Sequence, residues 1–366
     1  MKLDFINLPA VKASDAHGVM PKEFEPGLVS VIIPTFNRGN LLGEAIDSVL
    51  GQTYRPIECV IADANSTDNT FEVVRRKQAS ITQNEGFKLI YVTEPNRGAS
   101  ASRNLGLRNC SGEFIQFLDS DDVLTCEKLN HQVQVLRSDG DLEVVWSGWT
   151  VVLAPALQTA LQKANVCLQT SNFEPAKAVP TKSVIPWEPW PCLFRRRLCI
   201  VAGPWNEKTS RLEDWEYALR ILSRHPKAAF LEGVYCVARI HEGPRQNDLD
   251  FKPDGVERGL VACREARKAN LELAPTDVKI RQLIGERYWE IGLEALLRGT
   301  DAQAIEAFGA AAGLGSRKRF RMKAVVAWCV MRLTGRQLTK RLLKRHLTFK
   351  QSTPQAMALS NIQNSM

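Results

Sequence analysis

Long apolar runs are missing from this 366-residue sequence, and their absence limits the class of protein it can encode. The longest uninterrupted run, 324–331, has eight residues, whereas a membrane-spanning helix needs roughly 20. The N-terminus carries Asp4 and develops no apolar core, so we expect no secretory signal. Any association with a membrane is therefore expected to be peripheral.

Paired cysteines are also missing. The nine cysteines show no CxxC spacing and no local cluster with histidine, which argues against a disulfide framework and against structural zinc. With 44% hydrophobic residues, the chain can bury a sizeable core, and its length suggests about two domains. We therefore expect an enzyme-sized protein with reduced thiols in a cytoplasmic setting.

Acidic residues are missing from one segment, 317–350, which contains twelve lysines and arginines. Because the whole chain has a net charge of +8, the remainder is mildly acidic. Nucleic-acid binding is not expected, since no base-reading module accompanies the basic segment. Two interpretations stay open: a solvated basic face on a packing helix, or an interfacial helix on an anionic membrane. The second rests on the apolar residues Phe320, Ala324, Val325, Ala327, Trp328 and Met331 among the cations.

Apolar strands alternate with amphipathic helices through the first part of the chain. The predicted strands are 29–34, 59–62, 88–92 and 114–118, and the predicted helices are 41–50, 70–78, 99–109 and 127–136. This alternation indicates an α/β fold with a mostly parallel sheet covered by helices on both faces. In such sheets ligands bind outside the carboxyl ends of the strands, where this chain places its polar clusters.

The later part of the chain is less regular. We expect long substrate-selecting loops over 151–191, an amphipathic helix over 213–223, and helices from about 253 onward. The expected domains are an N-terminal extension, 1–27, an α/β domain, 28–250, and a helical C-terminal region with a basic tail, 251–366. The tryptophans at 187, 190 and 205 either stack on a sugar ring or belong to the core.

The run Phe117-Leu118-Asp119-Ser120-Asp121-Asp122 places three carboxylates within four residues at the end of a predicted strand. Like charges at such short separation repel, so the cluster is stable when it is solvated or when a divalent cation neutralises it. Carboxylate oxygens suit Mg²⁺ or Mn²⁺, which complete their shell with water and phosphate oxygens. The run is therefore either an aspartate-rich polar turn or a cation site.

Four ordered blocks resemble the signature blocks of family 2 glycosyltransferases. They are 29–49 (VSVIIPTFNRGNLLGEAIDSV), 63–70 (DANSTDNT), 96–122 (NRGASASRNLGLRNCSGEFIQFLDSDD) and 212–222 (LEDWEYALRIL). Four blocks in order are far more specific than any single motif, and the resemblance covers roughly residues 28–245. It implies the GT-A fold, which is Rossmann-like, and inverting transfer of a sugar from a nucleotide diphosphate sugar.

The resemblance gives the acidic run a role. It implies Asp121 as the principal ligand of Mn²⁺ or Mg²⁺, with Asp119 acting beside it through water or a ribose hydroxyl. Asp122 could do either job. His241 resembles a position near the diphosphate or the metal, although a single histidine is more often structural.

The resemblance also implies a nucleotide pocket. Thr35 and Asn37 would help to form the base and ribose pocket, and Asp63 would accept a hydrogen bond from the base. At this point the family often has two adjacent acids, whereas in this chain Ala64 follows Asp63. We expect a UDP-sugar as donor. Arg103 would contact the nucleotide, unless it only pairs with an acid of the same cleft.

An inverting transfer needs a base that removes the proton of the acceptor hydroxyl, and the resemblance implies Asp214. The alternative is that Asp214 is simply an acid in the first turn of a helix. Together these residues imply a hexosyl-transferring enzyme that acts on a glycan or glycolipid in polysaccharide biosynthesis of the cell envelope. It would be cytoplasmic, or peripheral on the inner face of the membrane.

Two other functions use similar folds. A nucleotidyltransferase acting on sugar phosphates would show a glycine-rich phosphate loop after the first strand, and residues 34–38 lack the glycines. A non-catalytic module that binds a nucleotide sugar would not need Asp119, Asp121 and Asp214 together, which speaks against it.

Overall fold

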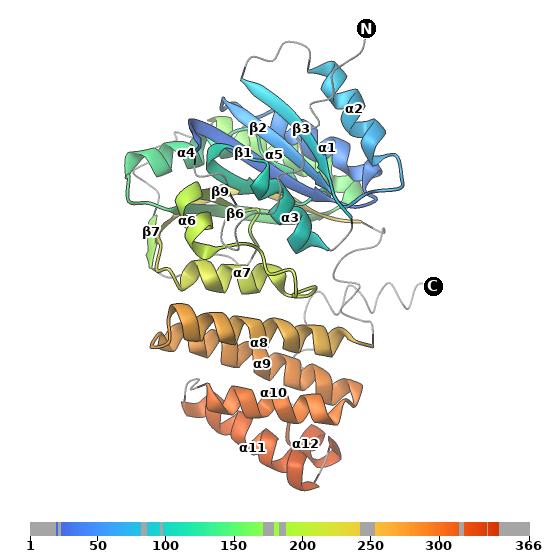
Figure 1. The fold of residues 1–366 in the computed structure, drawn as a ribbon, viewed down its shortest axis with the longest axis vertical. Helices are drawn as coiled ribbons and strands as arrows, with labels where there is room; N and C mark the ends of the chain where they lie inside the picture. The colour runs from blue at the N-terminus through green and yellow to red at the C-terminus, as the bar shows by residue number, and fades with distance from the viewer. Residues whose placement is uncertain are drawn as a thin grey trace.

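A nine-stranded mixed sheet with helices on both faces forms one end of the molecule, and a stack of helices forms the other (Figure 1). The computed structural model describes residues 20, 23–81, 86–95, 98–170, 179–182, 188–241, 253–314, 318–334 and 336–343. The strand order is β3-β2-β1-β4-β8-β6-β9-β5, and β7 also pairs with β9.

The first four strands pair in parallel, as the alternation of strands and helices predicts; they are β1 (Glu25–Thr35), β2 (Ile57–Asp63), β3 (Phe87–Thr93) and β4 (Gly112–Phe117). The second half of the sheet is mixed. It contains β5 (Val123–Leu124), β6 (Val144–Leu153), β7 (Val179–Lys182), β8 (Cys192–Arg195) and β9 (Lys227–Ile240). Here β6 and β9 are parallel, whereas β8 runs antiparallel to both of its neighbours, β4 and β6.

Alternating side chains of β1 enter two different cores. Val29, Val31 and Ile33 point to one face, where they meet α1 (Gly39–Leu50), α2 (Thr70–Ser80) and α4 (Lys128–Ser138). Ile32 points to the opposite face, covered by α3 (Ala99–Arg108), α6 (Arg196–Ala202) and α7 (Glu213–Leu222). A strand that is buried on both faces has a continuous apolar sequence, which explains the run of β-branched residues in β1.

Phe117, at the end of β4, lies fully buried at the centre of the second core. Its ring makes edge contacts with the rings of Phe194, Trp205 and Tyr217 at centroid distances of 6.2, 5.2 and 6.1 Å. We expect Phe117→Ala to lower the free energy of unfolding by about 3–5 kcal/mol, because it leaves a cavity among rigid rings. Urea unfolding measures this, with the half-exposed Phe24→Ala as the control. A loss no larger than that of the control would contradict the packing.

The helical region packs against the sheet-containing part of the protein. In Figure 1, α8 packs under α7, and the remaining helices stack beyond it, away from the sheet. These helices are α8 (Gly255–Leu273), α9 (Val278–Arg298), α10 (Asp301–Gly313), α11 (Lys318–Thr334) and α12 (Arg336–Leu342). One apolar cluster runs from Ile32 in the sheet to Leu343 beyond α12. Over the described part of the chain, no helix is both long and apolar enough to cross a membrane.

The prediction of long loops over 151–191 is wrong for much of that segment. β6 extends to Leu153, and 157–170 form the helix α5 (Leu157–Thr170). Leu157 is buried against Val123 of β5 and Val237 of β9, so α5 covers strands that the sequence pattern did not indicate. Residue 187 lies outside the described residues.

Candidate active site

Three loops meet at one edge of the sheet because their strands are parallel neighbours. Thr35, at the end of β1, is paired with Asp63, at the end of β2, and the acidic run follows β4 on the other side of β1. The N-terminus of α7 and the end of β9 reach the same edge, as the ion pairs described below establish. The sequence-predicted residues from all four blocks therefore lie together.

Arg103 joins the acidic run to α7. Its Nη2 atom donates to Asp119 Oδ1 at 3.0 Å, and its Nη1 atom lies 3.0 Å from Asp214 Oδ1 and 3.8 Å from Glu213 Oε1. The guanidinium lies over the ring of Trp205 at 4.4 Å from its centroid. Arg103 is only 3% exposed and pairs with acids of the cleft, and its predicted contact with a nucleotide stays a prediction.

Trp205 fixes the position of that guanidinium. Its ring stacks on Tyr217 of α7 at 4.0 Å with an interplanar angle of 10°, and its backbone N–H donates to Asn104 beside Arg103. Trp190 and Trp205 are both buried, so the core interpretation is confirmed for these two tryptophans.

Asp214 lies in the first turn of α7, two positions after a strained residue. Leu212 adopts a left-handed conformation with a φ of 60°, which is costly for a leucine and turns the chain into the helix. Burial is the largest influence on the Asp214 carboxyl, and it raises the pKa to about 8 from an ordinary 3.8, against the opposing charge of Arg103. A carboxylate with this pKa suits a general base near neutral pH.

The same burial makes the stability of the protein fall with rising pH. The folded protein keeps a proton on Asp214 up to about pH 8, whereas the unfolded chain releases it near pH 4. Burial also raises the pKa of Asp119 and Asp122, with the same sign. We expect the free energy of unfolding to fall by more than about 1 kcal/mol between pH 5 and 8, and Asp214→Asn to reduce this fall.

Urea unfolding at several pH values tests this expectation. The control is Asp141→Asn, which changes a carboxylate whose side chain is 87% exposed. A wild-type stability that is constant or rises over this pH range would contradict the assignment, as would an equal effect of both substitutions.

Asp121 and His241 form a second pair at the same edge. His241 Nε2 lies 3.0 Å from Asp121 Oδ2, and Arg38 Nη1 lies 3.1 Å from the same ring nitrogen. The side chain of His241 is 6% exposed, and its Nδ1 atom is buried without a hydrogen-bond partner in the described part of the chain. His241 thus lies against the acidic run, and its predicted place near a diphosphate or a metal stays a prediction.

This pair fits a Mg²⁺ or Mn²⁺ ion that takes few protein ligands. Within the described ranges, no group of three or more histidine, cysteine, aspartate or glutamate residues could hold a metal. A cation bound by a full protein cage is therefore not indicated there. One carboxylate and one imidazole suit an ion that completes its shell with water and diphosphate oxygens.

Asp122 points away from this pair and holds the acidic run to β9. Its Oδ1 atom accepts a hydrogen bond from the backbone N–H of Arg239 at 2.9 Å, and Arg239 Nε donates to the backbone oxygen of Asp121 at 2.8 Å. Burial, followed by the charges of Asp121 and Asp119, raises the pKa of Asp122 well above its ordinary value. Its contacts are those of a residue that fixes the loop.

The residues predicted to hold the nucleotide link the loops after β1 and β2. Asp63 Oδ1 accepts from Ser66, and its Oδ2 accepts from the Tyr91 hydroxyl at 2.5 Å. Asn37, which has a φ of 51°, accepts from the backbone N–H of Thr67 at 2.8 Å. Thr35 is buried, and its hydroxyl has no partner among the described residues, so it is free to bond a ligand.

Sequence reasoning assigned no role to three residues of this site: Arg38, Tyr91 and Arg239. Arg38 follows β1, and Arg239 precedes His241. Each is a cation near the end of a strand, and a cation in that position could have been predicted to face the acidic run. Tyr91 gives no such signal, because its contact with Asp63 depends on the pairing of β2 with β3.

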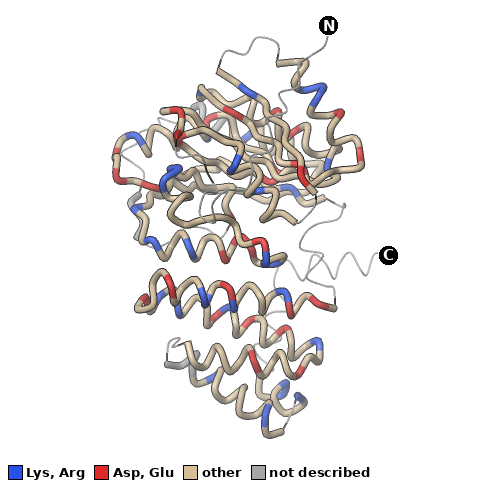
Figure 2. The backbone as a smooth tube through the Cα atoms, viewed as in Figure 1, with Lys and Arg blue, Asp and Glu red and all other residues tan. Residues whose placement is uncertain are grey.

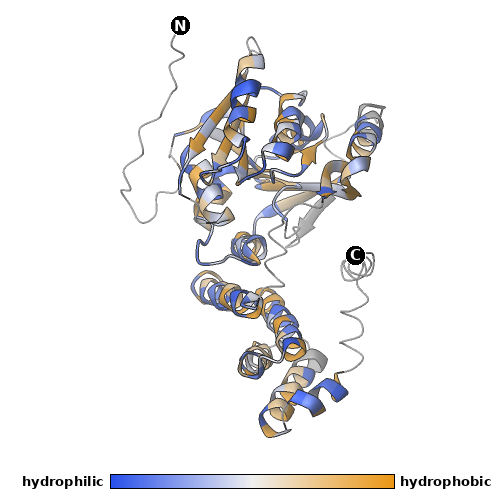
Figure 3. Ribbon diagram, turned by 90° about the vertical axis from the view of Figure 1, so that its right-hand side faces the viewer, coloured by the Kyte–Doolittle hydropathy of each residue, from blue (hydrophilic) through white to orange (hydrophobic). Residues whose placement is uncertain are grey.

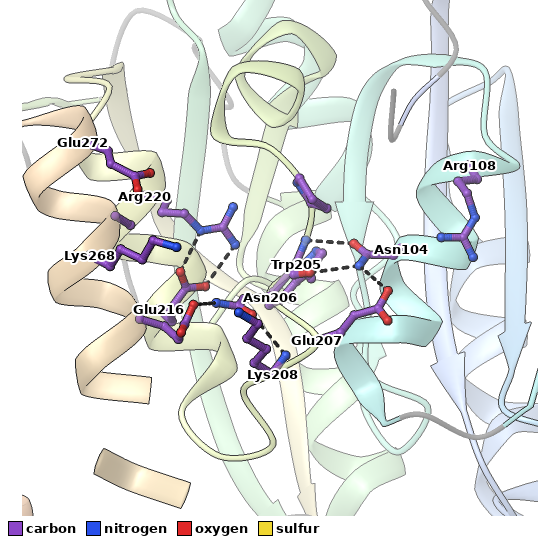
Figure 4. Close-up of a pocket in the computed structure, with 13 residues that line it drawn as sticks. Asn104, Arg108, Trp205, Asn206, Glu207, Lys208, Glu216, Arg220, Lys268 and Glu272 are labelled. Carbon is purple, nitrogen blue, oxygen red and sulfur yellow. Dashed lines mark hydrogen bonds and ion pairs between the residues drawn. The ribbon is translucent and has the colours of Figure 1, made fainter. Parts of the chain in front are cut away.

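A separate cavity of about 530 Å³ lies beside this cluster, where the sheet domain meets the helical region (Figure 4). It is lined by residues of α3, the 204–208 loop, α7 and α8, and it is crossed by the Arg220–Glu216 ion pair at 2.8 Å. Asn206 also donates to Glu265 of α8 at 3.0 Å. Trp205, which packs against Arg103, is among its lining residues, whereas none of the residues predicted for catalysis, metal or nucleotide binding is.

The architecture defines the class of protein. The chain superposes on S. aureus TarS 1-349, solved in complex with UDP-GlcNAc, over 84% of this chain and 88% of that one, with a TM-score of 0.62 and 19% identity. Mannosyltransferase PcManGT from Pyrobaculum calidifontis, solved with GDP-Man and Mn²⁺, matches over 92% of this chain and 88% of its own, with a TM-score of 0.50 and 21% identity. This protein therefore has the GT-A fold, as the resemblance implied.

Sequence comparison points to one family. Residues 30–175 of this chain match the family described as Glycosyl transferase family 2. An uncharacterized glycosyltransferase of Rickettsia felis is 39% identical over 134 residues, which are 36% of this chain and 21% of that protein. The Escherichia coli protein WfgD is 39% identical over 110 residues, 30% of this chain and 41% of its own. The chain thus matches less than half the length of either relative.

Proposed function

We propose that this protein is a metal-dependent inverting glycosyltransferase that moves a sugar from a nucleotide diphosphate sugar to a hydroxyl of a glycan or glycolipid. One observation carries the proposal. The buried guanidinium of Arg103 contacts both Asp119, in the acidic run after β4, and Asp214, at the start of α7. The proposed donor-binding acid and the proposed base are thereby held by one cation.

In this mechanism Asp214 removes the proton of the acceptor hydroxyl while the oxygen attacks the anomeric carbon. The bond from that carbon to the diphosphate oxygen breaks on the opposite face, so the configuration inverts, and the nucleotide diphosphate leaves with the bonding electrons. Burial raises the pKa of Asp214 to about 8, which gives the carboxylate the basicity for this step. Arg103 keeps Asp214 in place and favours its charged form.

The donor would lie along the carboxyl ends of β1, β2 and β4. Thr35, Asn37 and Asp63 would hold the base and ribose, with a UDP-sugar favoured, and Asp119 would bind a ribose hydroxyl. Asp121 and His241 would hold Mn²⁺ or Mg²⁺, which when bound supplies positive charge for the leaving diphosphate. The Mn²⁺ in the PcManGT structure supports a metal for this fold.

The acceptor is proposed from the relatives. WfgD is described as a UDP-Glc:alpha-D-GlcNAc-diphosphoundecaprenol beta-1,3-glucosyltransferase, which makes a lipid-linked sugar the first acceptor to test and polysaccharide biosynthesis for the cell envelope the proposed setting. No disulfide joins any of the eight cysteines whose side chains the structure describes, which supports a cytoplasmic location, with the enzyme peripheral on the inner membrane face.

Release of nucleotide diphosphate from a panel of UDP-, GDP- and dTDP-sugars tests the proposal, with Mn²⁺, with Mg²⁺ and with a chelator. Each donor is incubated with a lipid-linked N-acetylglucosamine acceptor, and a coupled assay detects the released nucleotide. We expect release from a UDP-sugar only in the presence of a divalent ion, and a product whose anomeric configuration is opposite to that of the donor. Binding of a donor without release from any member of the panel would instead favour the non-catalytic module.

A further inference from the structure

Helix α11 carries apolar side chains on two opposite sides. Ala324, Ala327 and Met331 are buried in the core cluster, on the side that packs against α10. These are residues from which the sequence suggested a membrane-facing helix, and the structure shows that they pack inside the protein instead. The basic segment is therefore, on this side, a packing helix.

The opposite side of α11 forms an exposed apolar stripe. Its members lie three, four, seven and eleven positions after Met322, a helical spacing that places them on one face. We call them the outer stripe: Met322, Val325, Val326, Cys329 and Leu333. Four of them are among the exposed large apolar residues, with exposed fractions of 65% for Met322, 39% for Val325, 48% for Val326 and 82% for Leu333. Figure 3 shows apolar colouring at this end of the molecule, far from the sheet.

The two helices that carry the outer stripe and its neighbours have cations and no acids of their own, although Arg336 lies 3.9 Å from Asp301 of α10. Arg332 lies on α11, and Arg336, Lys340 and Arg341 lie on α12 (Figure 2). From 317 to 350 the sequence contains twelve cations and neither aspartate nor glutamate. Leu338 and Leu342, one turn apart on α12, are also exposed, at 41% and 57%. An apolar stripe on helices whose own charges are all positive is complementary to a surface that is apolar inside and anionic outside.

This charge pattern disfavours two other occupants. A second copy of the chain would bring the same cations against this face, and like charges would repel. The segment 344–350, which follows directly, would bring Lys344, Arg345 and Lys350, which are again cationic. A nucleic acid would satisfy the cations but not the exposed leucine, valine and methionine side chains.

We propose that α11 and α12 dock on a membrane surface that contains anionic lipids, with the outer stripe entering the interface and the cations contacting lipid headgroups. This inference deepens the proposed function, because it would bring the enzyme to a lipid-linked acceptor. It can nevertheless fail separately, since binding to vesicles requires neither donor nor turnover.

Co-sedimentation of the full chain with vesicles tests this proposal. One set of vesicles is phosphatidylcholine alone, and the other contains equal parts of phosphatidylcholine and phosphatidylglycerol, each at low and high salt. The first variant, Val326→Glu with Leu333→Glu, places charge in the outer stripe. The second, Lys340→Glu with Arg341→Glu, reverses two cations. The matched control is Leu271→Glu with Val278→Glu, at positions 60% and 52% exposed on α8 and α9.

We expect wild type to bind the anionic vesicles, more weakly at high salt, and to bind phosphatidylcholine alone poorly. Each charge near the surface changes the partition coefficient roughly fivefold, so both double variants should bind about tenfold or more weakly. The control should bind as wild type does. All changed positions are at the surface, and circular dichroism with thermal unfolding verifies that each variant folds.

Three results would overturn the proposal. The first is that wild type does not bind anionic vesicles, or binds neutral vesicles equally well. The second is that folded outer-stripe variants bind as tightly as the control. The third is that wild type is a dimer which the outer-stripe variants dissociate while their vesicle binding is unchanged.

Discussion

Asp214→Asn is expected to lower the turnover of sugar transfer by roughly 10²- to 10⁴-fold, which is the contribution of a positioned general base. Asparagine has nearly the shape of aspartate and lies in the same first turn of α7, but it cannot accept a proton. Affinity for the donor should change little, because the Asp214 carboxyl would act on the acceptor. Turnover with a fixed donor and acceptor, together with donor affinity from calorimetry, measures the two effects separately.

Glu213→Gln is the matched control for this substitution. Glu213 is the adjacent acid, and its side chain is more deeply buried than that of Asp214. Its Oε1 atom lies 3.8 Å from Arg103 Nη1, whereas Asp214 Oδ1 lies 3.0 Å from the same atom. We expect its turnover to remain within about tenfold of wild type, since it would not face the acceptor hydroxyl. If Glu213→Gln loses activity as fully as Asp214→Asn, or if Asp214→Asn is as active as wild type, Asp214 is not the base.

The pH profile of turnover gives a second signature of the same residue. A base acts only when it is deprotonated, and burial raises the pKa of Asp214 to about 8. Turnover should therefore rise from pH 6 and level off above about pH 8, over the range in which stability is expected to fall. The residual activity of Asp214→Asn should lack this rise. The carboxyl group of Asp214 would thus stabilise the folded protein when it is protonated and act as the base when it is ionised.

The first half of the fold could be predicted because its signals are local. β1 to β4 are β-branched or aromatic runs separated by amphipathic helices, and each pairs with a parallel neighbour. The second half could not, because its strands depend on distant partners. β8 has only four residues between β4 and β6, and β9 contains Gly233 with a φ of 121° where its register with β6 shifts.

Prediction of the site residues was limited in the same way. Asp119, Asp121 and Asp214 stand out as acids at the end of a strand or at the start of a helix, so residue type and position were enough to predict them. Their partners were not predictable, because Arg38 and His241 are 203 positions apart and meet only when β1 and β9 end at the same edge. Periodicity shows which face of a strand is buried, but not which strands share an edge.

The anions that Arg103 contacts could not be predicted, for the same reason. Its place at a helix start after small residues indicated an anion site, and an anion site was the favoured interpretation. The anions that it meets in the structure are carboxylates of the protein, two of which come from α7, more than a hundred positions along the chain. A pattern can indicate that an arginine binds an anion without indicating which anion.

Asp121→Asn is expected to remove most of the metal response. The carboxylate beside His241 is the candidate principal ligand, and asparagine keeps its shape while giving up the negative charge that holds a hard cation. A bound cation stabilises the leaving charge by several kcal/mol, so kcat/KM should fall on the order of 10²- to 10³-fold. Activity measured across a Mn²⁺ titration gives both the loss and any shift of the half-saturating concentration.

Asp122→Asn distinguishes metal binding from the placement of the loop. Asp122 accepts from the backbone N–H of Arg239, and because burial raises its pKa, the neutral amide of asparagine is a close substitute. We expect its Mn²⁺ response to match that of wild type, whereas Asp122→Leu, which cannot accept that hydrogen bond, should lower stability by about 1–3 kcal/mol. The assignment fails if Asp122→Asn loses the Mn²⁺ response and Asp121→Asn keeps it, because the ligand would then be the acid that the structure holds against β9.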